Sequence, residues 1–171
     1  MIRIVGIGDD ISMEALDLLA ARLAVELRLA CHVDPQRIDP NFAYDAVRNQ
    51  HHATAILRRL SHFGKEGRVL GVATVDLYVP IFTFVFGEAQ LAGPAALISR
   101  YRLLQQHYGL PHDPELTADR LLKEALHELG HTFGLRHCHD WSCPMASSTS
   151  VERLDLKKSS LCAACRDVVR A

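Results

Sequence analysis

The sequence has 171 residues, of which 49% are hydrophobic and 23% are charged. This length favours one domain with a real core, and the apolar content excludes a disordered chain. The sequence contains 19 Lys and Arg residues and 20 Asp and Glu residues, so the net charge is −1 and we expect no nucleic acid partner. The ten His residues are a high number and give a first indication of metal chemistry.

The first half of the chain alternates between predicted strands and helices. Apolar runs and alternation predict strands at about residues 2–7, 27–35, 69–75, 82–86 and 95–101, with 82–86 near a sheet edge. Helical spacing predicts one helix at residues 13–27, capped by Ser12, and another at residues 41–63. A turn is expected at residues 64–67.

The second half begins with a long predicted helix that Thr117 can cap and that runs to about Phe133. Gly134 is placed to end this helix. The residues from 137 to 160 are polar and show no clear periodicity, and a short final helix is expected from Ser159 or Ser160 to Val169.

The N-terminal apolar run is too short for the core of a signal peptide, because it ends at Gly8. No stretch approaches the roughly 18 apolar residues of a membrane-spanning helix. We therefore expect a cytoplasmic protein without a membrane partner, and a monomer, since nothing in the sequence requires an oligomer. In a reducing compartment, clustered cysteines indicate metal binding rather than disulfides.

One segment matches the pattern H-E-x-x-H-x-x-G-x-x-H, at His127, Glu128, His131, Gly134 and His137. His127 and His131 are four residues apart, so both imidazoles project from one helix face and can share a tetrahedral ion. Gly134 allows a left-handed turn, after which His137 can return to the same ion. Three neutral imidazoles leave Zn²⁺ one open position for water, which is typical of a catalytic site.

The position of Glu128 suggests a mechanism. It follows the first ligand directly, so it can reach a water on the ion without replacing a ligand. Zn²⁺ lowers the pKa of its bound water and polarises a substrate carbonyl. Glu128 is then predicted to act as the general base and to pass the proton to the leaving amine, which gives peptide-bond hydrolysis. Co²⁺ or Ni²⁺ could occupy the same site after purification.

A second cluster consists of thiols in a C-x4-C … C-x2-C arrangement, at Cys138, Cys143, Cys162 and Cys165. Two paired knuckles separated by a loop are the usual layout of a closed four-cysteine site, so we predict a second, structural Zn²⁺. Buried free thiols or disulfides are the alternative. Because Cys138 directly follows His137, the structural metal would hold the third catalytic ligand in place. Nearby basic residues are expected to offset the thiolate charge: Arg136, Lys157, Lys158 and Arg166.

The combined spacing H-E-x-x-H-x-x-G-x-x-H-C-x4-C-x-M … C-x2-C resembles that of the archaemetzincins, a family of metzincin-type zinc metalloproteases, from Leu121 to Cys165. The resemblance implies one catalytic and one structural zinc on the residues named above, with Met145 in a tight turn beneath the catalytic ion. Residues 84–89 resemble the edge-strand region of that family. Some metzincins carry a Tyr two residues after this Met. Ser147 stands there instead, so the oxyanion stabiliser is unassigned.

The alternating elements indicate an α/β (α+β) fold. The resemblance implies a compact metzincin-like domain with a mixed, mostly parallel sheet flanked by helices. We expect a single domain over residues 1–171. It divides into sheet and helices at 1–116, the active-site helix at 117–134, and a zinc-pinned C-terminal segment at 135–171.

The predicted function is that of a cytoplasmic zinc metallopeptidase that acts on peptides or proteins. Two alternatives stay open: a catalytically weak or inactive zinc-stabilised peptide-binding protein, and a hydrolase of non-peptide amides. An intact Glu128 favours an enzyme, because a binding protein needs no base there. The absence of a Tyr at position 147 favours a binding protein. The pattern does not distinguish an endopeptidase from an aminopeptidase.

Overall fold

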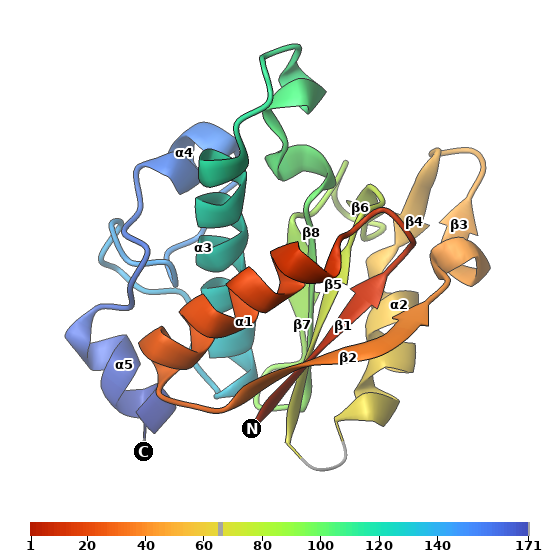
Figure 1. Cartoon of the computed structure of the whole chain (residues 1–171). Helices are drawn as coiled ribbons and strands as arrows, with labels where there is room; N and C mark the ends of the chain where they lie inside the picture. The colour runs from red at the N-terminus through yellow and green to blue at the C-terminus, as the bar shows by residue number, and fades with distance from the viewer. Residues whose placement is uncertain (65–66, 171) are drawn as a thin grey trace.

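The chain forms a mixed sheet covered by helices on both faces (Figure 1). The computed structural model describes residues 1–64 and 67–170. The main sheet has the strand order β2-β1-β5-β8-β7, in which the first four strands are parallel and β7 is antiparallel at the edge. This arrangement confirms the predicted mixed, mostly parallel sheet. Its strands are β1 (Ile2–Ile7), β2 (Cys31–Ile38), β5 (Arg68–Ala73), β7 (Gly87–Ala89) and β8 (Ala95–Ser99).

A smaller sheet and five α-helices complete the described residues. The small sheet has the order β3-β4-β6, with β3 (Tyr44–Asp45), β4 (Gln50–His52) and β6 (Leu77–Tyr78). The helices are α1 (Met13–Leu27), α2 (Ala53–Leu60), α3 (Pro114–Thr132), α4 (Val151–Asp155) and α5 (Ala163–Arg170). Short 3₁₀ turns lie at Pro40–Ala43, Ser61–Phe63, Tyr101–Leu103 and Gln105–Tyr108. Within the described ranges, every helix is too short or too polar to cross a membrane.

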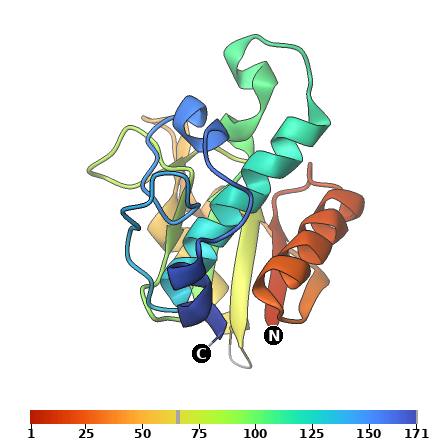
Figure 2. The same cartoon turned by 90° about the vertical axis from the view of Figure 1, so that its left-hand side faces the viewer.

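The main sheet carries a separate core on each face, because alternate residues of a strand point to opposite sides. On β1, Ile2 and Ile4 pack with α1 and α3, whereas Val5 and Ile7 pack with α2. Figure 2 shows α1 beside α3 on one face and the C-terminal segment, in blue, running along α3. Because α3 also contacts β7 and β8, this packing brings the histidine motif to the edge of the sheet.

Several local predictions are confirmed. The helix α1 has the predicted bounds, and the Ser12 hydroxyl accepts a hydrogen bond from the Ala15 N–H group. The strand β5 is buried on both faces, as its continuous apolar sequence indicated. The turn predicted at residues 64–67 falls partly outside the described residues, at 65 and 66.

The helix predicted at residues 41–63 is wrong over its first half. Residues 44–52 instead form the β3–β4 hairpin, and only Ala53–Leu60 is α-helical. Asn49 adopts a left-handed conformation (φ 54°), and the Asp45 carboxylate accepts a hydrogen bond from the Val47 N–H group at 2.9 Å. Asp and Asn offer the backbone such turns in place of helical hydrogen bonds, which helical spacing alone does not reveal.

The second strand begins later and ends later than predicted. Arg28, in a left-handed conformation, ends α1, so the strand starts at Cys31 rather than at 27. It also continues through Pro35 to Ile38. Pro is tolerated there because β2 is an edge strand and its register with β1 shifts where Asp34 and Arg37 flank the irregularity.

The strand predicted at residues 82–86 is also wrong. The edge strand is β7, and residues 82–86 form an irregular loop with a single bridge from Val85 to Leu77. Side chains donate hydrogen bonds to backbone carbonyls of this loop that would otherwise pair with a neighbouring strand. Arg48 donates to the Phe82 carbonyl at 3.1 Å, and Gln50 donates to the Thr83 carbonyl at 3.0 Å.

The remaining differences concern the ends of elements. The strand predicted at 95–101 ends at Ser99. Asp113, not Thr117, caps α3, and its carboxylate accepts a hydrogen bond from the Leu116 N–H group at 2.9 Å. The final helix starts later than predicted, and the short helix α4 lies within the segment expected to be irregular.

Candidate active site

The helix α3 presents His127 and His131 on one face, with their Nε2 atoms 3.2 Å apart. Each ring is oriented by a backbone carbonyl 2.8 Å from its Nδ1 atom, from Pro144 for His127 and from Leu135 for His131. Because a carbonyl only accepts, both Nδ1 atoms donate and both Nε2 atoms keep a free lone pair. This is the tautomer in which histidines bind metals.

The end of α3 explains how His131 is held. Gly134 has φ 88°, and its N–H group donates to the His131 carbonyl at 2.9 Å, while the Leu135 N–H group donates to the Gly130 carbonyl at 3.1 Å. These two bonds form a Schellman motif, as Gly134 was predicted to allow. The turn aims the Leu135 carbonyl back at the His131 ring and sends the chain toward His137.

The three imidazoles fit a tetrahedral metal. One ligand nitrogen from each of His127, His131 and His137 can be chosen so that all lie within 4.8 Å of one another. With Zn–N bonds of about 2.0–2.1 Å, two such atoms stand about 3.3–3.4 Å apart, close to the 3.2 Å seen for His127 and His131. Two facing lone pairs at this distance repel unless a cation lies near both. Burial lowers the pKa of His127 to about 3, against the opposing effect of the Pro144 carbonyl, and keeps the imidazole neutral.

Glu128 lies beside the histidines with only 6% of its surface exposed. Burial raises the pKa of its carboxyl well above the usual value. The carboxylates of Glu124 and Glu88 raise it further, and Lys157 opposes them. The edge strand reaches Glu128 because residue 87 is Gly. A Cβ atom there would lie 2.7 Å from the Glu128 Cγ atom and 2.9 Å from its Oε1 atom.

Met145 packs against Gly130 of α3, next to His131 in the chain, and is fully buried. It follows Pro144, whose carbonyl orients His127, and its own carbonyl accepts a hydrogen bond from the Cys138 N–H group at 3.0 Å. Its side chain lies against Gly130 of α3, where an added Cβ would stand 2.2 Å from the sulfur. One tight turn thus supports the His127 ring and packs against α3.

The four predicted thiols also converge, and their sulfur atoms all lie within 4.8 Å of one another. The Cys138 and Cys162 sulfurs are 3.9 Å apart. A tetrahedral zinc with Zn–S bonds of about 2.3 Å places its sulfurs about 3.8 Å apart, so the cluster has the size of a zinc site with four cysteine ligands. The Cys162 N–H group also donates to the Cys143 sulfur at 3.5 Å, a contact typical of thiolates.

A cleft of about 330 Å³ opens beside the histidines. The loop at 82–86 and Gly87 form one wall, α3 forms the floor, and the chain after Met145 forms the other wall. The cleft is lined by Phe82, Thr83, Phe84, Val85, Phe86, Gly87, Glu124, His127, Glu128, His137, Ser147, Ser148, Thr149 and Lys157. A larger cavity of about 430 Å³ lies between the starts of α1 and α3, and the three histidines do not line it.

The sequence is similar to those of archaeal proteins named archaemetzincin. It is 41% identical to the one from Methanocaldococcus jannaschii over 156 residues, which are 91% of this chain and 86% of that protein. It is 43% identical to the one from Methanopyrus kandleri over 132 residues, 77% of this chain and 72% of that protein. A sequence model of peptidase family M54 matches residues 36–171. The chain belongs to peptidase family M54.

Solved structures agree with this M54 assignment. The crystal structure of archaemetzincin from Methanopyrus kandleri has a TM-score of 0.85 and 37% identity, covering 99% of this chain and 92% of that chain. A structure from Methanocorpusculum labreanum, described as a zinc-dependent peptidase, has a TM-score of 0.90 and 28% identity, covering 98% and 99%. The mixed sheet and its flanking helices therefore form the archaemetzincin fold.

In this M54 chain, the residues predicted for each metal lie together. The three histidines form one group, with Glu128 beside them in the same cleft, and the four cysteines form another group. The two groups are adjacent in the chain, at His137 and Cys138. Their roles as ligands and base stay predictions.

Three residues at the archaemetzincin cleft were missed or misread from the sequence. Glu124 was not singled out, although it lies one helical turn before Glu128. Gly87 was placed at a strand end and within the edge-strand region at 84–89, but not against Glu128. Lys157 was expected to offset the thiolate charge, and Cys143 is one of its charge partners, but its buried ammonium also donates to the carbonyls of Pro144, at 3.0 Å, and Ala146. The signal available for Glu124 was its spacing of four residues from Glu128 on one helix, whereas no local pattern placed Lys157 at the cleft.

Proposed function

We propose that this protein is a zinc-dependent peptidase that hydrolyses peptide bonds, with Glu128 as the general base. The observation that carries the proposal is the convergence of three imidazoles, two with Nδ1 atoms fixed by carbonyls, next to a buried carboxylate at a cleft. His127, His131 and His137 would hold the catalytic ion and leave its fourth position open.

The zinc ion, when bound, lowers the pKa of a water and polarises the scissile carbonyl. Glu128 accepts a proton from the attacking water and delivers it to the leaving amine. Its buried position favours the neutral acid that must donate, while the positive charge of a bound metal favours the carboxylate that must accept. Burial keeps His127 neutral, and the fixed carbonyls of Pro144 and Leu135 accept from the Nδ1 atoms of His127 and His131, which leaves each Nε2 atom to the metal.

The edge strand offers a way to hold an extended substrate. In the described sheet, β7 pairs with β8 on one side and ends the strand order on the other. A peptide can add to such an edge through main-chain hydrogen bonds. Because Gly87 at the start of β7 contacts Glu128, a peptide on this edge would pass the histidines.

The cysteine group would hold a second, structural zinc, so that the chain binds two ions. The sulfur spacing supports a closed tetrahedral site. Clustered thiols of this kind fit a reducing compartment such as the cytoplasm. We propose a monomer that acts on peptides or proteins without a nucleic acid or membrane partner.

The Glu128→Gln variant tests the mechanism. It removes the base but keeps the size of the side chain, so we expect retained zinc and a loss of hydrolysis of about a hundredfold or more. The measurement is cleavage of a mixed peptide library by the zinc-loaded parent and variant, read by mass spectrometry, with the zinc content of both determined.

Cleavage by the variant at the parental rate would contradict the role of Glu128. If neither protein cleaves any peptide while both hold zinc, the peptide-binding alternative gains support. Hydrolysis confined to small amides added to the same panel would indicate the non-peptide alternative.

A further inference from the structure

The active-site cleft extends along α3 beyond the catalytic base. Glu124 precedes Glu128 by four residues, so it lies on the same helix face, about 6 Å nearer the N-terminus. Both side chains line the cleft, together with Lys157 and the chain at 147–149, whereas His131 does not line it. The cleft therefore has a side-chain-sized pocket on the Glu128 side of the histidines.

The position of Glu128 decides which substrate residue enters this pocket. As the base of the proposed function, it must reach the leaving amine, so it stands on the leaving-group side of the scissile bond. Glu124 lies farther along in the same direction. The pocket therefore faces the first residue after the scissile bond, the P1′ residue.

The Glu124 carboxylate determines which side chain the pocket can bind, because it accepts no hydrogen bond within the described residues. Glu124 is 5% exposed, and among the described residues it receives no hydrogen bond and has no basic group within 4 Å. Lys157 is equally buried, but it already donates to the carbonyls of Pro144 and Ala146. The buried Ser148 hydroxyl oxygen also lacks a partner among the described residues. The Ser148 hydroxyl can donate as well as accept, so what the pocket lacks is a charged donor for the Glu124 carboxylate.

The rest of the lining favours a donor that is long and cationic. Phe82, Phe84 and Phe86 line the same cleft. Phe86 is mostly buried and the Phe84 ring already carries the Arg102 guanidinium, so the exposed Phe82 ring is the one open to a substrate. Aromatic rings hold the methylene stem of an Arg or Lys side chain and attract its charged head. The lining holds two carboxyl groups, Glu124 and Glu128, against the single ammonium of Lys157, and a catalytic metal would mainly balance Glu128.

We propose that this pocket selects Arg or Lys at P1′, with the Glu124 carboxylate as the group that binds the cationic head. The proposal rests on the proposed function only for the direction of the substrate. It makes Glu124 a specificity-determining residue rather than part of the hydrolytic machinery.

Binding of hydroxamates tests the pocket without requiring turnover. The probes have the form HONH-CO-CH2-CH(R)-CO-NH-CH3, with the side chain of Arg, Leu or Glu as R, so R takes the place of the P1′ side chain. Calorimetry at pH 8 with the zinc-loaded protein should give about tenfold or tighter binding for Arg than for Leu. The ratio should fall to about two or less in Glu124→Gln and stay parental in Glu115→Gln, which removes an exposed charge from the same helix.

Equal affinity for the three probes, including no binding of any, would overturn the proposal, as would a preference for Leu or Glu. An Arg preference that survives in Glu124→Gln would overturn the role of Glu124. The peptide library separates the two proposals. Cleavage that depends on Glu128 but shows no basic P1′ preference defeats only the pocket, whereas Arg-selective binding without cleavage defeats only the hydrolytic function.

Discussion

At the scale of single residues, the histidine group depends on carbonyl groups as much as on the rings. The carbonyls of Pro144 and Leu135 each lie 2.8 Å from an Nδ1 atom and fix which nitrogen of each ring is free to bind a metal. The Pro144 carbonyl accepts hydrogen bonds from both His127 and Lys157. The turn at Met145 therefore contacts both α3 and the C-terminal segment. Such outer contacts commonly change metal affinity about 10–100-fold when they are lost.

Gly130 shows how tightly the turn is packed against α3. A Cβ at this position would lie 2.2 Å from the Met145 sulfur, so Gly130→Ala should destabilise the protein by about 1–3 kcal/mol through overpacking. Chemical denaturation of the zinc-loaded protein measures this change. The Met145→Ala background supplies the control, because the clash partner is then absent and Ala is the better helix former. An equal loss in both backgrounds would show that the cost arises elsewhere.

At the scale of elements, the cysteine cluster fastens the chain that carries His137 and the Met145 turn. The Cys138 N–H group donates to the Met145 carbonyl, and the Lys158 N–H group donates to the Ser142 carbonyl at 2.8 Å. The Leu161 N–H group reaches Glu26 of α1 at 3.0 Å. Between Leu135 and Val151, Met145 is the only large aliphatic side chain of this segment in the described core, so its packing alone holds the stretch weakly.

We therefore expect Cys162→Ser to weaken zinc binding at the histidines about tenfold or more, although Cys162 is not one of their neighbours in sequence. A competitive chelator titration that follows the more weakly bound ion measures the effect. Cys31→Ser is the matched control, since Cys31 lies on β2 outside both groups. An unchanged affinity at the histidine site would remove the proposed coupling.

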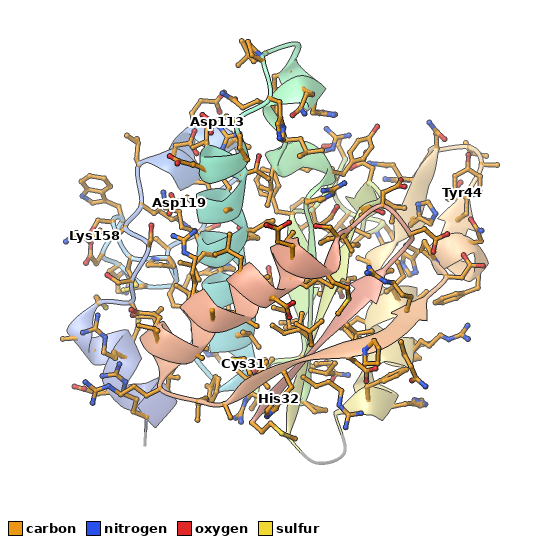
Figure 3. The ribbon with its side chains drawn as sticks, in the orientation of Figure 1. Cys31, His32, Tyr44, Asp113, Asp119 and Lys158 are labelled. Atoms are coloured by element: carbon orange, nitrogen blue, oxygen red, sulfur yellow. The ribbon has the colours of Figure 1, made fainter. Side chains whose placement is uncertain are left out.

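A second link between elements centres on Asp119 of α3 (Figure 3). Its carboxylate accepts hydrogen bonds from Arg22 of α1 at 3.2 Å and from Ser159 of the C-terminal segment, and it pairs with the buried Lys123 at 2.7 Å. Burial acts to raise the pKa of Asp119, but these hydrogen bonds outweigh burial and lower it. The lowered pKa means that the carboxylate stabilises the fold above its unfolded pKa of about 3.9, and that this contribution is lost as the pH falls through the folded value.

Asp119→Asn should accordingly lower the free energy of unfolding by about 1–3 kcal/mol, by the same amount at pH 5 and at pH 8. Urea denaturation at both pH values measures it. Asp167→Asn on the exposed face of α5 should change stability by less than about 0.5 kcal/mol. A difference between parent and Asp119→Asn that varies between pH 5 and 8 would point to another titrating group.

The sequence predicted elements best where one physical signal dominated. The apolar run of β5, the Ser12 cap and the Gly134 turn each depend on local chemistry and are confirmed. The errors arose where distant side chains decide the backbone. Arg48 and Gln50 hold the loop at 82–86 away from a sheet, and no local pattern encodes those contacts.

At the scale of the whole molecule, the fold forms the cleft at the histidine motif by bringing together three segments that are far apart in the chain. The edge strand β7 contributes Gly87 against Glu128, and the helix α3 contributes two of the histidines. The C-terminal segment contributes His137 and the second wall of the cleft. Motif spacing predicted the two residue groups, whereas the pocket at Glu124 and Lys157 required the folded chain, because their proximity arises from the path of residues 138–157.

We propose that two zinc ions organise the C-terminal third of the chain, an open one on histidines and a closed one on thiolates. An anomalous-difference map from a crystal of the zinc-loaded protein, recorded at the zinc absorption edge, tests it most directly. We predict two peaks per chain, one among the histidines and the other among the four cysteine sulfurs: His127, His131 and His137; Cys138, Cys143, Cys162 and Cys165. A single peak, or disulfides in place of the thiolate peak, would contradict the account.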